Sequence, residues 1–169
     1  MHIFQIKVQS ICFVDGIIVV GGEAYRRIKT SEVFYNGTNL QCNIPDLQFG
    51  ISHPAAVATP YGIVLCAGNG DYYSCLRLTP DNEWVSFPSL THKRFDLEMF
   101  YFEGMLWAIE GEKGGVEYID PANGSHWTSI LPRPTLYSTN PGCITELSNN
   151  SVIETGGYQD YGVRIQPYI

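Results

Sequence analysis

The sequence is poor in charge and in long apolar runs, and both shortages limit what the chain can be. Only 16% of its 169 residues are charged, against 44% that are hydrophobic, which excludes an intrinsically disordered chain. No apolar run approaches the roughly 20 residues that a membrane-spanning helix needs, so we expect no membrane insertion. The formal net charge of −7 argues against a nucleic-acid-binding protein.

Closely spaced cysteines and helical periodicity are also missing. The five cysteines contain no C-x-x-C pair, which argues against a zinc knuckle or a thioredoxin-type motif. No window shows a sustained apolar period of 3.6 residues, so helices should be scarce. Abundant glycine (17), tyrosine (11) and proline (10) favour short strands and tight turns instead.

Four segments share one pattern, in which an apolar strand ends at glycine. The spacings between these glycines are 46, 43 and 46 residues, for Gly22, Gly68, Gly111 and Gly157. A turn and an apolar stretch precede each segment, and a polar loop and a third strand follow it. Three repeats continue to a fourth strand, and a proline closes each of them. The expected unit is therefore four short antiparallel strands, a to d in chain order, in about 45 residues.

The pattern predicts an all-β chain in which residues 1–169 form repeats of roughly 7–49, 50–93, 94–139 and 140–169. A single four-stranded sheet exposes both faces, and radial stacking of such sheets buries them, which is the propeller solution. The expected strands lie near residues 8–14, 17–21, 32–36, 53–58, 63–67, 74–79, 96–102, 105–109, 115–119, 141–147, 151–155 and 162–166, with weaker d strands.

The order of a glycine-pair strand, then Tyr, Trp and Pro, resembles the kelch repeat. The nearest matches are "VVGG" with Tyr35, and "EYIDP" with Trp127 and "LPRP", and the resemblance covers essentially the whole chain. The sequence departs from the kelch pattern where Ala67 and Glu110 replace Gly21, and where repeat one lacks the Trp. The resemblance implies a kelch-type β-propeller segment of about three full four-stranded antiparallel blades plus a partial fourth.

The repeat count leaves the ring incomplete. The missing blades would come from the rest of a longer chain or from self-association. Alternatively, residues 2–6 would supply the missing d strand and close a four-bladed ring. Within the repeats, a glycine at the end of strand b permits close approach of neighbouring sheets. Trp84 and Trp127 should fill the space between sheets, with each indole N–H meeting a carbonyl.

Charges of opposite sign are expected on opposite faces, because b–c loops and d–a connections share one face and a–b and c–d turns share the other. The first face carries seven basic and five acidic residues, and the second carries six acidic residues and no Lys or Arg. The basic residues are Arg26, Arg27, Lys29, Lys93, Arg94, Lys113 and Arg133, against Glu23, Asp46, Asp71, Glu112 and Asp160. The opposite acids are Asp15, Asp81, Glu83, Glu103, Asp120 and Glu146. This polarity favours an acidic protein partner.

Aromatic residues share the basic face, and tyrosine and arginine are enriched in interface hot spots. The kelch resemblance implies that these same loops form a partner-binding surface. The predicted partner-binding residues are Tyr25, Arg26, Arg27, Lys29, Tyr72, Tyr73, His92, Lys93, Arg94, Lys113, Arg133 and Tyr137.

We therefore expect a non-catalytic protein-interaction module with no cofactor and no metal. The resemblance implies one specific form of it, the substrate-receptor part of a ubiquitin ligase, although the BTB/BACK or F-box domain of such receptors does not fit in this chain. One alternative is a secreted, glycosylated propeller that acts in adhesion or in the extracellular matrix. A galactose-oxidase-like enzyme is the other, although no histidine recurs at metal-ligand spacing.

The cellular compartment stays open, with the cytoplasm favoured and secretion as the alternative. Glycosylation sequons begin at Asn36, Asn123 and Asn149. A hairpin centred on residues 70 and 71 would set Cys66 directly opposite Cys75, with both side chains on one sheet face. We expect a disulfide there if the protein is exported, and two neighbouring buried thiols if it is cytosolic.

Overall fold

The computed structural model describes residues 3–6, 16–23, 25–35, 38–40, 44–68, 71–94, 97–109, 115–130, 143–147, 151–155 and 164–166. All regular structure in these residues is β-strand, which confirms the expectation of an all-β protein. Among the same residues there is no helix that could cross a membrane.

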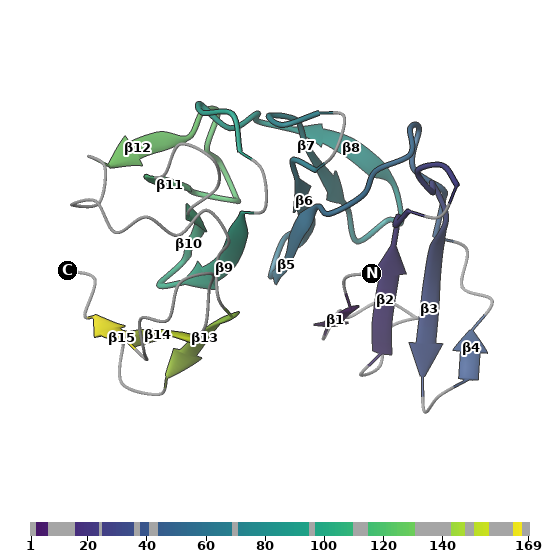
Figure 1. Cartoon of the computed structure of the whole chain (residues 1–169), viewed down its shortest axis with the longest axis horizontal. Coiled ribbons are helices and arrows are strands. Elements are labelled where there is room, and N and C mark those ends of the chain that lie inside the picture. The colour runs from purple at the N-terminus through teal and green to yellow at the C-terminus, as the bar shows by residue number, and fades with distance from the viewer. Residues whose placement is uncertain are drawn as a thin grey trace.

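The strands form four antiparallel sheets, each made of strands that are consecutive in the sequence (Figure 1). The first sheet contains β1 (Ile3–Ile6), β2 (Gly16–Val20), β3 (Ser31–Tyr35) and β4 (Thr38–Leu40). The second contains β5 (Ala55–Thr59), β6 (Gly62–Cys66), β7 (Cys75–Leu78) and β8 (Trp84–Phe87). The third contains β9 (Glu98–Phe102), β10 (Met105–Ile109), β11 (Val116–Ile119) and β12 (Thr128–Ile130). The fourth contains β13 (Cys143–Leu147), β14 (Ser151–Thr155) and β15 (Arg164–Gln166).

At the start of the chain the structure differs from the prediction in the strand that pairs with β2. The predicted strand at 8–14 lies outside the described residues, and β2 pairs instead with β1, from Ile3 opposite Val19 to Ile6 opposite Gly16. The prediction assumed a tight turn at Asp15 and Gly16. Loop-closure entropy grows slowly with length, however, so a longer connection costs little. Because β1 belongs to the first sheet, the alternative in which residues 2–6 complete the last sheet is wrong.

The first strands of the four sheets lie next to one another. β1 contacts β5, β5 contacts β9, and β9 contacts β13. In Figure 1 the sheets follow one another around an arc, with these first strands on its inner side and β4, β8, β12 and β15 on its outer side.

The second sheet is buried on both faces, which explains why β6 is apolar throughout. Ile63 and Leu65 of β6 belong to an apolar cluster that includes Ile18 and Val33 of the first sheet. The alternate residues of β6, Val64 and Cys66, belong to a cluster with the third sheet. Successive side chains of a strand point to opposite faces, so stacking on both sides requires an unbroken apolar run rather than alternation.

Trp84 and Trp127 lie between sheets and their indoles are hydrogen-bonded, as predicted. Trp127 is 2% exposed and belongs to the cluster that joins the second and third sheets. Its Nε1 donates to the carbonyl of Pro88, over 2.7 Å. Trp84 packs against the cluster that joins the first and second sheets, and its Nε1 donates to the carbonyl of Pro45, over 2.9 Å. Trp84 remains partly exposed, so the two residues are not equivalent in burial.

Glycines at the ends of β2 and β6 make room for the connection between the first two sheets. Gly21 has a φ of 67°, and a Cβ there would lie 2.6 Å from the carbonyl oxygen of Ile51. Gly68 has a φ of 116°, and a Cβ there would lie 2.8 Å from the carbonyl oxygen of Ser52. Both positions need glycine for conformation and for space. Close approach is therefore confirmed at Gly21 and Gly68, where the connection between the sheets packs against the glycine, whereas Gly111 and Gly157 lie outside the described residues.

The hairpin between β6 and β7 has the register predicted from the cysteine positions. Cys66 lies directly opposite Cys75, with a Cα–Cα distance of 4.1 Å, and their sulfur atoms form a disulfide. Both residues are buried in the cluster between the second and third sheets. The disulfide therefore ties two central strands together inside an intersheet core.

Candidate interaction surface

One end of the sheets is built from the b–c loops and the d–a connections, and we call it the connector face. Its described residues are 21–30, 44–54, 67–74 and 88–94, with gaps at 24, 69 and 70. Each connection is hydrogen-bonded to the b–c loop of its own sheet. The amide of Ile51 donates to the carbonyl of Ile28, and the amide of Arg94 donates to the carbonyl of Tyr72. The two connections thus repeat one geometry, with Ile51 and Arg94 at equivalent places.

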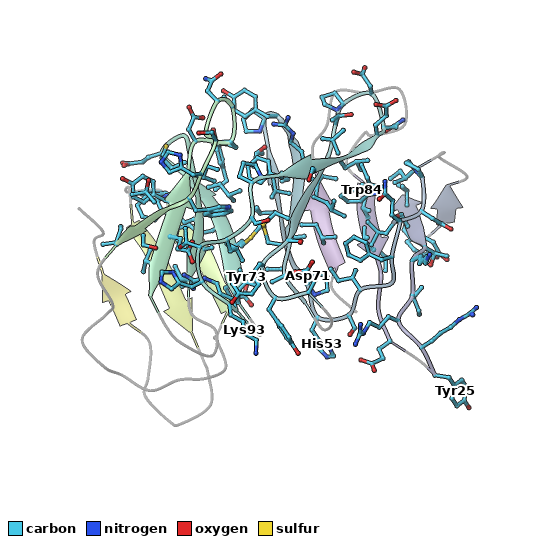
Figure 2. The ribbon with its side chains drawn as sticks, turned by 90° about the horizontal axis from the view of Figure 1, so that it is seen from above. Tyr25, His53, Asp71, Tyr73, Trp84 and Lys93 are labelled. Atoms are coloured by element: carbon cyan, nitrogen blue, oxygen red, sulfur yellow. A yellow bond between two sulfur atoms is a disulfide. The ribbon has the colours of Figure 1, made fainter. Side chains whose placement is uncertain are left out.

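Three aromatic side chains of the connector face are exposed to solvent. Tyr25 is fully exposed, Tyr73 is 44% exposed, and Phe49 is also exposed. Figure 2 shows Tyr25 and Tyr73 along the same side of the molecule as Asp71, His53 and Lys93, whereas Trp84 lies away from that side.

Basic residues accompany these aromatic side chains. Arg26 and Arg27 are exposed beside Tyr25, and Lys29 is exposed with its Nζ donating to the carbonyl of Gln48, over 2.8 Å. The ammonium of Lys93 lies 4.4 Å from the centre of the Tyr72 ring, which is cation–π geometry. The structure therefore brings two aromatic and basic groups to this face, one on the first b–c loop and one between the second b–c loop and the next connection.

The carboxylate of Asp71 organises the second b–c loop. Its Oδ1 accepts from the amides of Ser74 at 2.9 Å and Tyr73 at 3.0 Å. Partial burial alone would raise the pKa of Asp71, but the hydrogen bonds from Ser74 and Tyr73 outweigh it and the pKa is lowered. Asp71 is therefore ionised at neutral pH and fixes the loop that presents Tyr73.

Arg94 is not available for a partner, which corrects its predicted role as a binding residue. Its side chain is 1% exposed, and its Nε and one terminal nitrogen donate to Oε1 of Glu117 at 3.0 and 2.8 Å. The other terminal nitrogen donates to the carbonyl of Gly115. A charge this deeply buried requires a partner, and the partner comes from the neighbouring sheet.

Glu117 is a buried, ion-paired residue that the sequence analysis did not single out. Its side chain is fully buried, and its Oε2 also accepts from the amide and hydroxyl of Thr91. Burial alone would raise the pKa of Glu117, but the hydrogen bonds from Thr91 and the charge of Arg94 lower it below its usual range. The sequence feature that could have indicated it is a single acidic residue in the middle of the apolar strand "GVEYI".

His92 adjoins this pair at the surface, as predicted for a connector-face residue. Its side chain is 52% exposed, and its Nδ1 lies 3.2 Å from Glu117 and 3.3 Å from the hydroxyl of Ser129. Ser129, His92 and Glu117 are the residue types of a catalytic relay. Such a relay needs the serine hydroxyl on one nitrogen of the histidine ring and the carboxylate on the other. Here both approach Nδ1, so the cluster positions the connection and does not activate Ser129.

The remaining predicted residues divide between described and undescribed parts of the chain. Asn123 is exposed in the turn between β11 and β12. Among the residues that the structure describes, no three His, Cys, Asp or Glu side chains are grouped as metal ligands. Lys113, Arg133, Tyr137, Asn36 and Asn149 lie outside the described residues.

Among the described residues, the two ends differ in charge with the predicted sign. Without the buried Arg94, the connector face holds four basic and three acidic residues. We call the opposite end the turn face; its described residues are 60–61, 79–83, 103–104 and 120–127. It carries Asp81, Glu83, Glu103 and Asp120, with no Lys or Arg in those ranges. The connector face is therefore the more favourable end for an acidic ligand.

No family model matches the chain, and a search of curated proteins finds no similar one. The resemblance to the kelch repeat therefore rests on the sequence pattern alone.

Proposed function

We propose that the chain is a kelch-type β-propeller segment that binds an acidic segment of another protein through its connector face. The observation that carries the proposal is the group of aromatic and basic side chains on that face: Tyr25, Arg26, Arg27 and Tyr73 are exposed, and Lys93 is partly exposed. Aromatic and arginine side chains give the largest contact energies in interfaces. Hydrogen-bonded connections and the Asp71 turn hold them on a rigid support, which lowers the entropy lost on binding.

The propeller part of the proposal rests on the arrangement of the sheets. The strands are three to five residues long and run up and down in each sheet, the second sheet is packed on both faces, and the first strands of neighbouring sheets are in contact. Blades of a propeller share these features. Further sheets would be needed to close a ring of the size that propellers adopt.

An acidic peptide array tests the binding proposal. We expect Asp/Glu-rich peptides to be retained and neutral peptides of the same length to be released. The triple change Arg26→Glu, Arg27→Glu and Lys93→Glu should weaken retention about tenfold, because three lost ion pairs at roughly 0.5 kcal/mol each amount to about 1.5 kcal/mol. Asp81→Lys with Glu83→Lys on the turn face is the control and should leave retention intact. Equal retention of neutral peptides, or loss only in the control, would contradict the proposal.

Tyrosine truncations give a second, charge-independent test. Tyr73 on the connector face and Tyr61 on the turn face are each 44% exposed, so they form a matched pair. Tyr73→Ala should weaken peptide retention, whereas Tyr61→Ala should not. Thermal unfolding of both variants separates a lost contact from a lost fold.

The disulfide favours the second candidate, in which the same propeller acts outside the cell in adhesion or in the matrix. Disulfides persist in oxidising compartments and are rare in the cytosol. The bond between Cys66 and Cys75 is formed and buried, so it acts as part of the structural core. Thiol counting on protein isolated from its own cells distinguishes the two compartments.

A further inference from the structure

The sequon that begins at Asn123 lies in a surface turn. Asn123 and Ser125 are both exposed, in the connection from β11 to β12. The backbone of this turn is held from within: the amide of Gly124 donates to the carbonyl of Asp120 over 2.8 Å, and the amide of Ala122 donates to the Asp120 carboxylate over 2.8 Å. The folded turn can therefore carry a large substituent on Asn123 without losing its own hydrogen bonds.

A second, independent observation concerns the compartment in which the chain folds. The Cys66–Cys75 disulfide is enclosed in the core between the second and third sheets. Disulfides form and persist in oxidising compartments, so this bond points to a chain that folds under oxidising conditions. In cells that glycosylate asparagine, the secretory compartment that forms disulfides also modifies Asn-x-Ser/Thr sequons.

We propose that Asn123 is an N-glycosylation site of an exported protein. The amide Nδ2 of Asn123 forms a bond to the anomeric carbon of a lipid-diphosphate-linked oligosaccharide. The bond from that carbon to the diphosphate oxygen breaks, the lipid diphosphate leaves, and the amide proton passes to a base of the transferase. The hydroxyl of Ser125 is the group by which the transferase recognises the sequon.

The position of Asn123 also determines which surface the glycan covers. Leu106 lies opposite Ile119 and Met105 lies opposite Phe102, so the β11–β12 turn is at the same end of the sheet as the Glu103 and Gly104 turn. That end is the turn face. A glycan there shields the acidic end and leaves the connector face open, so the site is compatible with the proposed binding function and does not depend on it.

The test is peptide mapping of the full chain secreted from glycosylating eukaryotic cells behind a cleavable leader. We expect a glycan on Asn123 that a glycan amidase releases. The release converts Asn123 to aspartate, and carrying it out in heavy-oxygen water labels that aspartate. Ser125→Ala, which keeps Asn123 but destroys the sequon, should abolish the glycan. Ser125→Thr, which preserves the sequon, should retain it. Peptides containing Asn36 and Asn149 are read separately in the same map.

Three results would overturn the proposal. The first is secreted protein whose Asn123 is unmodified. The second is conversion of Asn123 to aspartate without a glycan, which is ordinary Asn-Gly deamidation. The third is retention of an unglycosylated chain inside the cell with free thiols at Cys66 and Cys75.

Discussion

An isoleucine and a leucine, Ile51 and Leu76, pack together between the first and second sheets. Replacing Arg94 by Ile and Glu117 by Leu would place the same apolar pair between the second and third sheets. Ile51 occupies the place of Arg94 in the earlier connection, as the matching amide–carbonyl bonds show. Leu76 occupies the place of Glu117, since each is the second residue of the third strand of its sheet. Ile51 and Leu76 share one apolar cluster. The double substitution therefore tests whether the two junctions are built alike.

The single substitutions should be far more damaging than the double one. Glu117→Leu alone leaves the 1% exposed guanidinium of Arg94 without a counter-charge, which costs about 3–5 kcal/mol. Arg94→Ile alone leaves the buried Glu117 carboxylate with the Thr91 donors only, at a similar cost. The double variant removes both charges. In the double variant Thr91 loses the carboxylate to which it donates, but Thr91 is exposed and can donate to water instead. The Gly115 carbonyl loses the donor that Arg94 supplied. Together these losses should lower the free energy of unfolding by about 1–2 kcal/mol.

Urea unfolding of the four proteins, followed by tryptophan fluorescence, measures the result. We expect the double variant to be more stable than either single one, with a coupling free energy of at least about 3 kcal/mol and unchanged m-values.

The pH dependence gives a second readout of the same pair. The pKa of Glu117 is lowered in the folded state, so its stabilisation is complete above the ordinary value of 4.5 and is lost as pH falls through the folded pKa. Removing both groups should reduce the acid sensitivity. Additive destabilisation in the double variant, of about 6 kcal/mol or more, would refute the equivalence of the two junctions.

Three further predictions follow from burial and backbone geometry. Trp127→Ala should cost about 3–5 kcal/mol in urea unfolding, as for a buried aromatic residue, and the partly exposed Trp84→Ala clearly less; equal losses would contradict the difference in burial. Burial raises the pKa of Glu98 to about 7, so stability should fall as pH rises from about 4.5 to 7, and Glu98→Gln should raise the melting temperature at pH 8 but not at pH 4.5. Gly21→Ala should destabilise more than Gly104→Ala in thermal unfolding, because both have positive φ but only Gly21 has a carbonyl within 2.6 Å of the added Cβ.

The repeat pattern determined most of the fold because it is a local property of the sequence. An apolar strand, a turn and a second apolar strand fix an antiparallel hairpin with little choice of partner. The pairing of Cys66 with Cys75 could be predicted for the same reason, since the position of the turn fixes which residues of a hairpin lie opposite each other. Conversely, the partner of β2 was missed because Asp15 and Gly16 signal a tight turn, whereas the strand that pairs with β2, Ile3–Ile6, lies further back in the sequence.

Tertiary structure alone decided which polar residues are exposed. Lys93 and Arg94 are neighbours in the sequence and were predicted to serve one binding surface. In the structure Lys93 lies over the Tyr72 ring at the surface, whereas Arg94 turns inward to Glu117 of the next sheet. The sequence determined that two basic residues lie where the second repeat meets the third. Which of its charges faces solvent depended on the stacking of another sheet against it, because burial is set by residues far away in the chain.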